Sequence, residues 1–208
     1  MDYIKDPGKI ESTSMAIIDN ALEVSTFSPQ ELNIVKRMIH TTGDVEYQHL
    51  VLMTSGAVEA GIEAIRSGCR IVTDTRMAFA GINKRVLEQV NCCIECYIDH
   101  EDVFTLAQEK GITRSMVAME IAAQNQTDIF VIGNAPTALY RLGELIQETR
   151  ISPELIIGVP VGFVGAAEAK DYIRGIHVPS ITTIGTKGGS NVAAAAMNAI
   201  MYMAVGHA

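Results

Sequence analysis

Short runs of β-branched and aliphatic residues alternate with longer amphipathic stretches from Arg70 to the end of the chain. A short apolar run is typical of a buried strand, and apolar residues three and four positions apart are typical of a helix. The pattern predicts five strands, each followed by a sequence compatible with a helix: Arg70–Asp74, Cys92–Ile98, Asp128–Ile132, Leu155–Val159 and Ser180–Ile184.

Two of these runs, Ile129–Ile132 and Leu155–Val159, contain no alternating polar residues. Strands buried on both faces have this pattern, and such strands occur in parallel sheets covered by helices on either side. The sequence therefore predicts an α/β fold with a mostly parallel five-stranded sheet flanked by helices, in a Rossmann-like three-layer arrangement. The chain has 208 residues and no evident linker, which predicts a single domain spanning residues 1–208.

Two helices are expected before the first predicted strand, one around Thr13–Glu23 and one beginning near Ser28. The second has clear boundary signals, because Ser28 suits an N-cap and is followed by proline and, three positions later, by glutamate. Gly43 suits the left-handed position after its last turn. His40 is therefore expected in that last turn, and Arg37 on the same face.

A histidine at this position has two interpretations. The negative end of the helix dipole favours a cationic side chain, which suits a proton donor near neutral pH. For a lone histidine, however, a solvated or C-capping side chain is the more frequent role, so the residue pattern alone leaves the role of His40 open.

The segments that follow the predicted strands are rich in glycine and small residues, and ligands of open parallel sheets bind beyond the carboxyl ends of the strands. The segment Gly185–Asn191 resembles an anion cradle, since its glycines expose N–H groups and Lys187 adds positive charge. It lacks the spacing of a phosphate-binding Walker loop, and no dinucleotide fingerprint follows the first strand. Tight turns without a ligand are the alternative.

Arg114 follows Thr113, a plausible N-cap, and so falls in the first turn of an expected helix. A cation there opposes the helix dipole, and an anionic ligand held by the guanidinium would explain its position. A solvent-exposed arginine without a partner is the alternative. The last helix, expected over Val192–Val205, combines alanines with methionines, which indicates core packing or, alternatively, a subunit interface.

The composition excludes several classes of function. The formal net charge is −8 and no basic stripe is interleaved with aromatics, which disfavours a nucleic-acid partner. Neither an apolar run of about 18 residues nor a secretory signal occurs, so a cytoplasmic protein without a membrane partner is expected. Cys92, Cys93 and Cys96 fall in one predicted strand, where residues three apart point to opposite faces. We expect buried reduced thiols rather than a metal site.

Six segments together resemble one known enzyme family, the precorrin-8X methylmutases, and the resemblance extends through most of the chain. Their order and spacing are specific, although each alone is modest. The segments are Ser14–Ile18, Arg37–His40, Thr73–Met77, Ile132–Leu139, Gly158–Val164 and Gly185–Ser190.

This resemblance implies an isomerase of cobalamin biosynthesis that moves a methyl group from ring carbon eleven to ring carbon twelve of precorrin-8X or cobalt-precorrin-8. The product would be hydrogenobyrinate or cobyrinate, formed by a protonation-assisted sigmatropic shift. His40 matches the proposed proton donor and acceptor of the family. The resemblance implies no cofactor and no metal, because the shift requires neither a nucleophile nor a redox step.

The resemblance also implies a homodimer and a tetrapyrrole substrate with many carboxylate arms. The residues expected to bind it are Ser14, Arg37, Thr75, Arg76, Arg114, Lys187 and Gly188. Two other functions remain open: a corrinoid carrier that has lost its chemistry, and a nucleotide-binding oxidoreductase. Turnover of the substrate would exclude the first, and absence of nicotinamide binding would exclude the second.

Overall fold

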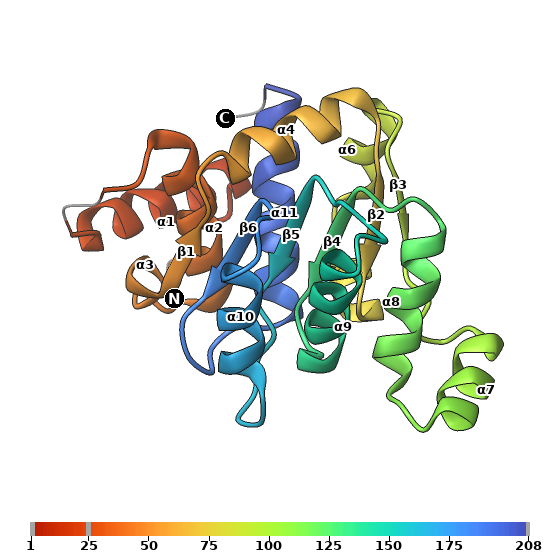
Figure 1. Cartoon of the computed structure of the whole chain (residues 1–208). Coiled ribbons are helices and arrows are strands. Elements are labelled where there is room, and N and C mark those ends of the chain that lie inside the picture. Colours follow the sequence, from red (N-terminus) through yellow and green to blue (C-terminus); the bar gives the residue numbers. More distant parts are fainter. Residues whose placement is uncertain (1–2, 24–25, 207–208) are drawn as a thin grey trace.

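The computed structural model of the chain describes residues 3–23 and 26–206 and contains one twisted sheet between two layers of helices (Figure 1). The order of the strands across the sheet is β1-β6-β5-β4-β2-β3. Their bounds are β1 (Val51–Met53), β2 (Arg70–Thr73), β3 (Cys93–Glu95), β4 (Ile129–Ile132), β5 (Leu155–Gly158) and β6 (Ser180–Thr183). All five predicted strands are present, and they pair in parallel.

The sixth strand, β1, was not predicted, so the five-stranded sheet is corrected to six strands. It pairs antiparallel with β6 at the edge of the sheet, with Val51 opposite Thr183. β1 has three residues and directly follows the short helix α3 (Tyr47–Leu50). Three residues are too few for a hydrophobic alternation to be read from the sequence.

Helices cover both faces of the sheet (Figure 1). One face carries α1 (Pro7–Ala21), α2 (Pro29–Thr42), α4 (Ala57–Ser67), α5 (Arg76–Gly81), α6 (Lys84–Gln89) and α11 (Ser190–Ala204). The other carries α7 (Glu101–Lys110), α8 (Arg114–Gln124), α9 (Pro136–Gln147) and α10 (Ala166–Arg174). The predicted three-layer arrangement is confirmed.

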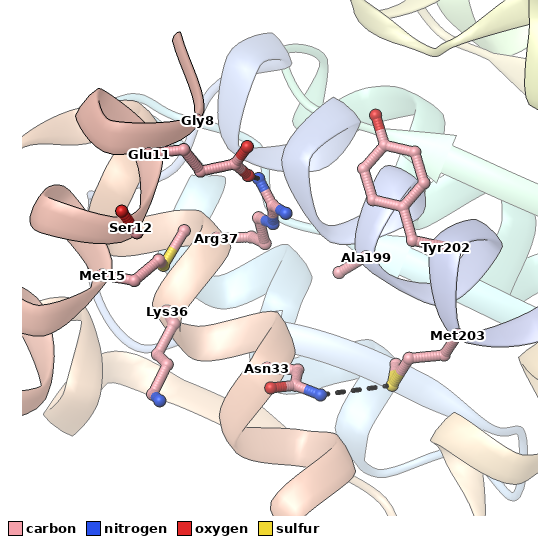
Figure 2. Close-up of a pocket in the computed structure, with 10 residues that line it drawn as sticks. All are labelled: Gly8, Glu11, Ser12, Met15, Asn33, Lys36, Arg37, Ala199, Tyr202 and Met203. Atoms are coloured by element: carbon pink, nitrogen blue, oxygen red, sulfur yellow. Dashed lines mark hydrogen bonds and ion pairs between the residues drawn. The ribbon is translucent and has the colours of Figure 1, made fainter. Parts of the chain in front are cut away.

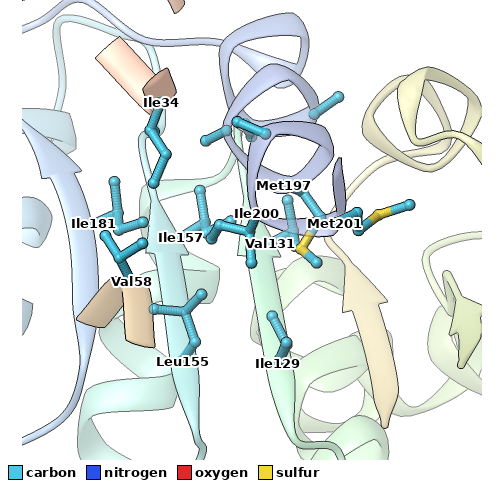
Figure 3. Packing of buried hydrophobic residues seen from close by; sticks show 14 of the residues in the cluster. Ile34, Val58, Ile129, Val131, Leu155, Ile157, Ile181, Met197, Ile200 and Met201 are labelled. Carbon is cyan, nitrogen blue, oxygen red and sulfur yellow. The ribbon is translucent and has the colours of Figure 1, made fainter. Parts of the chain in front are cut away.

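Successive residues of the central strands supply two separate cores. Ile129 and Val131 of β4 pack with Met197 of α11 on one face (Figure 3), whereas Phe130 and Ile132 belong to the core beneath α8 and α9. Full burial of each such side chain stabilises the fold by about 1.5–3 kcal/mol. A strand buried on both faces therefore needs the unbroken apolar run that the sequence shows.

The predicted boundaries of α2 are confirmed. The N–H of Ser28 donates to the Glu31 carboxylate at 2.7 Å, and the Glu31 N–H donates to the Ser28 hydroxyl at 3.3 Å. Gly43 follows the helix in the left-handed conformation, with φ of 67°. The first predicted helix, in contrast, starts earlier than expected, since Asp6 caps α1 by accepting from the Lys9 N–H.

The prediction of buried thiols holds for Cys69 and Cys96 but is wrong for Cys93, which is exposed because β3 is an edge strand. All four thiols are free, and the Sγ atoms of Cys69 and Cys92 lie 3.5 Å apart. The alanines and methionines of α11 are mostly buried in the core, as the packing interpretation expects. Within the described residues, the model contains no helix that is long and apolar enough to cross a membrane.

Gly133, at the end of β4, approaches the start of α11 so closely that a Cβ atom would lie 2.6 Å from Ser190 Cα. Gly133→Ala should therefore lower the free energy of unfolding by about 3 kcal/mol, because backbone would have to move. Gly111→Ala is the control, because Gly111 has φ of 64° but no atom lies within 4 Å of the added Cβ. This substitution should lower the free energy of unfolding by only about 1–2 kcal/mol. Urea unfolding measures both, and equal losses would contradict the close contact.

Candidate active site at the carboxyl edge of the sheet

The loops after β5 and β6 are joined to one another by main-chain hydrogen bonds. The Gly189 N–H donates to the Val159 carbonyl at 2.9 Å, and the Gly162 N–H donates to the Thr186 carbonyl at 3.1 Å. Gly188 lies so close to the end of β5 that a Cβ atom would be 2.1 Å from the Val159 oxygen. No other residue type fits at position 188 without displacing backbone, which explains a glycine there.

Asp74 fixes the loop after β4 from the end of β2. Its buried carboxylate accepts from the N–H groups of Gly133, Asn134 and Ala135 at 3.0, 2.8 and 2.8 Å. Burial raises the pKa of Asp74, and the three hydrogen bonds act in the opposite direction. Sequence reasoning did not assign this role to Asp74, although a carboxylate directly after a buried strand was a usable signal.

Thr75, expected to bind substrate, connects two helices. Its hydroxyl caps α5 by accepting from the Ala78 N–H at 3.1 Å and lies 2.8 Å from the Ser190 hydroxyl at the start of α11. The hydroxyl is half-buried and already has two partners. Thr75 therefore links α5 to α11 at the edge of the site.

His40 is exposed in the last turn of α2, as predicted. Two hollows of about 240 Å³ each border it. One is shared with Arg37 of the same helix and Asn191 and Asn198 of α11, and the other with Ser14 of α1. Within the part of the chain that the structure describes, the His40 side chain has no hydrogen bond or ion pair. Its imidazole is accordingly available to a ligand.

Ser14 and Arg37, which lie near His40, both have partners in the protein. The Ser14 hydroxyl donates to the Ile10 carbonyl at 2.8 Å inside α1, whose N-cap is Asp6. Arg37 lies 2.8 Å from Glu11 and 5.5 Å from the ring of Tyr202. Figure 2 shows its guanidinium directed at the Glu11 carboxylate in a further hollow of about 350 Å³ between α1, α2 and α11.

Lys187 connects the loop after β6 to the end of α2. Its ammonium lies 2.6 Å from both Asp44 and Glu46, which directly follow the helix that carries His40. The hydrogen bond from Lys187 is the main reason that the pKa of Asp44 is lowered. In the same region, the Tyr47 hydroxyl donates to the Gly188 carbonyl at 3.5 Å. The structure thus brings Lys187 and Gly188 to the end of α2.

Arg76 and Arg114 are the remaining two cations expected to bind substrate. Arg76, after β2, is exposed and pairs with Asp99 at 2.8 Å. Arg114 is the first residue of α8, as predicted, and lies 4.6 Å from the ring of Phe104. Figure 1 shows α7 and α8 at the side of the molecule opposite α2. Arg114 therefore lies far from His40, whereas Arg76 begins α5, whose last residue, Gly81, lines the hollow that His40 and Arg37 border.

Lys170 is a buried residue that sequence reasoning missed. Its ammonium, on α10, donates to the Thr183 hydroxyl at 3.1 Å and to the Lys187 carbonyl at 2.9 Å. Burial, followed by the nearby charge of Arg174, lowers the pKa of Lys170 to about 8. A signal existed, because position 170 falls on the apolar stripe formed by Ala166, Ala169 and Ile173.

Large apolar side chains are exposed next to the polar groups of this edge. Phe163 and Val164, in the loop after β5, are 95% and 90% exposed, and Met77 after β2 is 69% exposed. Neighbouring exposed apolar side chains, such as Phe163 and Val164, are typical of surfaces that contact a ligand or another protein. Together with the free imidazole and the nearby cations, they suit proton transfer to a large ligand that is apolar in the middle and anionic at its rim.

Comparisons with known proteins identify one family. Residues 9–203 match the family model described as precorrin-8X methylmutase. A cobalt-precorrin-8 methylmutase of Salmonella typhimurium is 43% identical over 97% of this chain and 98% of its own length. A precorrin-8X methylmutase of Pseudomonas aeruginosa is 38% identical, with 96% and 97% covered.

The same family is found among solved structures. A crystal structure of a precorrin-8X methylmutase from Thermus thermophilus superimposes with a TM-score of 0.88 at 39% identity, covering 96% of this chain and 98% of the other. The sequence and fold comparisons therefore agree. The chain belongs to the precorrin-8X methylmutase family, the isomerases that shift a methyl group within the ring precursor of cobalamin.

Proposed function

We propose that this enzyme moves the methyl group from ring carbon eleven to ring carbon twelve of precorrin-8X or its cobalt form, with His40 as the proton donor and acceptor. The supporting observation is the exposed imidazole at the end of α2, which has no partner among the described residues and shares a hollow with Asn191, at the end of the glycine-rich segment after β6. The cobalt form is the first substrate to test, because relatives at 40–43% identity carry its name.

In the proposed reaction, His40 protonates the macrocycle and makes the receiving carbon more electrophilic. The bond from the methyl group to ring carbon eleven breaks while the bond to ring carbon twelve forms, and the proton then returns to His40. No group leaves, so substrate and product are isomers. The remaining task of the protein is to hold the reactive tautomer in the geometry from which the methyl group migrates.

We propose that the carboxylate arms of the substrate bind the predicted cations and polar groups around the edge of the sheet. Arg37 and Arg76 already pair with the exposed carboxylates of Glu11 and Asp99, and Lys187 pairs with half-buried Asp44 and exposed Glu46. Exposed ion pairs are weak, so substrate carboxylates can replace the exposed partners at little cost while Asp44 stays in contact with Lys187. Arg114 is free of acidic partners among the described residues. Ser14, Thr75 and the Gly188 N–H complete the proposed binding residues.

We also propose a cytoplasmic homodimer whose second copy completes the binding cleft, with neither nucleic acid nor membrane as a partner. Each hollow beside His40 has about 240 Å³, whereas cavities that enclose ligands typically have about 300–1,000 Å³. A tetrapyrrole with its carboxylate arms therefore extends well beyond either hollow. The exposure of Phe163 and Val164 is consistent with a surface that a second copy or the macrocycle covers.

His40→Ala should lower kcat by about 100- to 10,000-fold, because a positioned general acid contributes a factor of this size. The measurement is the change in visible absorption when purified enzyme meets cobalt-precorrin-8 or precorrin-8X. His49→Ala is the matched control, since His49 is also an exposed histidine but lies in α3, 3.6 Å from Glu23, and it should retain the wild-type rate.

Equal rates for wild type and His40→Ala would keep the function but remove His40 from the mechanism. If the wild-type enzyme converts neither form of the substrate, the proposed reaction is wrong. Tight binding of the corrinoid without conversion would then favour the carrier interpretation.

The dimer should be measured by light scattering at the enzyme concentrations of the activity assay. We expect the mass of two chains, and a fall in specific activity on dilution into the range where the dimer dissociates, because the cleft is then incomplete. A monomer with full specific activity would contradict the proposed dimer without affecting the role of His40.

A further inference from the structure

Lys170 is a buried cation that the proposed mechanism does not use. Its side chain is fully buried, and no acidic side chain in residues 3–23 or 26–206 forms an ion pair with it. A buried charge without an opposite charge destabilises a fold unless hydrogen bonds compensate. The observed bonds are directed at the loop after β6, which suggests a role in that loop.

The two acceptors of Lys170 are coupled to each other. The ammonium donates to the Thr183 hydroxyl and to the Lys187 carbonyl, and the Thr183 hydroxyl itself donates to the Lys187 carbonyl at 2.8 Å. The carbonyl of Lys187 is thus held by two donors from inside the protein. This fixes the orientation of the peptide unit between Lys187 and Gly188.

The other end of that peptide is the N–H of Gly188. In a trans peptide the carbonyl and the N–H point in opposite directions, and the described residues contain no cis peptide. Because the carbonyl points toward α10, the Gly188 N–H points away from it. Within the described part of the chain this N–H donates no hydrogen bond to the protein, so it is an available donor.

We propose that Lys170 is a positioning residue that orients the Gly188 N–H as a hydrogen-bond donor for a carboxylate arm of the substrate. The inference rests on the proposed function, since it assigns the ligand chemistry of one of its binding groups. Lys170 does not touch the substrate, and it acts through the peptide that it binds.

A charged donor suits this role better than a neutral one. The positive charge polarises the Lys187 carbonyl and so strengthens the N–H of the same peptide as a donor. Although burial lowers the pKa of Lys170 to about 8, this value keeps most of the ammonium protonated at neutral pH. The positive end of the peptide is thereby presented to an anion.

The chain provides a matched control in Arg174. This residue is a second cation of α10, one turn after Lys170, and donates to the Thr182 hydroxyl at 3.1 Å and to Asp171. It binds β6 but not the side chain or backbone of Lys187. Arg174→Met therefore removes a positive charge from the same helix while leaving the proposed contact intact.

The test compares wild type with Lys170→Met, Lys170→Arg and Arg174→Met. In Lys170→Met the Gly188 cross-peak of the ¹H–¹⁵N spectrum should shift, and KM should rise about tenfold or more, as for loss of a charge-assisted hydrogen bond, while kcat changes little. Lys170→Arg should recover most of the KM, because the guanidinium can donate to the same carbonyl. Arg174→Met should leave the Gly188 cross-peak and KM close to wild type.

A folded Lys170→Met enzyme with unchanged KM and an unchanged Gly188 cross-peak would overturn the proposal, and so would an equal rise in KM in Arg174→Met. If Lys170→Met does not fold, Thr183→Val takes its place, since it removes the second donor to the Lys187 carbonyl. An unchanged KM in Thr183→Val would then overturn the proposal. Failure of the proposed function can be told apart from failure of this inference. In the first case the wild-type enzyme would be inactive, while the Gly188 cross-peak would still show whether Lys170 orients the peptide.

Discussion

Hydrogen bonds between two buried charged side chains and the main chain hold the carboxyl edge of the sheet in shape. Asp74 accepts from three successive N–H groups after β4, and Lys170 donates to the Lys187 carbonyl after β6. Loops of this kind have few apolar side chains with which to pack, so main-chain hydrogen bonds must fix them. The glycines then allow the loops to approach one another closely, as Gly188 approaches Val159.

The position of His40 depends on the same edge. Local sequence defines where α2 begins and ends, and the contact of Lys187 with half-buried Asp44, together with the hydrogen bond from Tyr47 to the Gly188 carbonyl, joins the end of that helix to the loop after β6. The proton donor and the groups suited to bind anions are thereby held in fixed positions relative to one another. Such preorganisation is what an isomerase needs when its main task is to hold a substrate in a reactive geometry.

Features set by local sequence were predictable, and features set by distant contacts were not. The capping box of α2 and the apolar runs of β4 and β5 each involve only a few neighbouring residues, so they could be recognised directly in the sequence. β1 has three residues and forms a strand because it pairs with β6, which lies far along the chain. The ion pairs of Arg37 and Lys187 and the burial of Lys170 likewise depend on the packing of separate elements.

The central claim is that the substrate binds at the carboxyl edge of the sheet with His40 against the macrocycle. A crystal structure of the enzyme with its corrin product tests this most directly. The account predicts the His40 imidazole within hydrogen-bonding distance of the macrocycle and a product carboxylate at the Gly188 N–H. A product bound away from α2, with His40 facing only solvent, would contradict it.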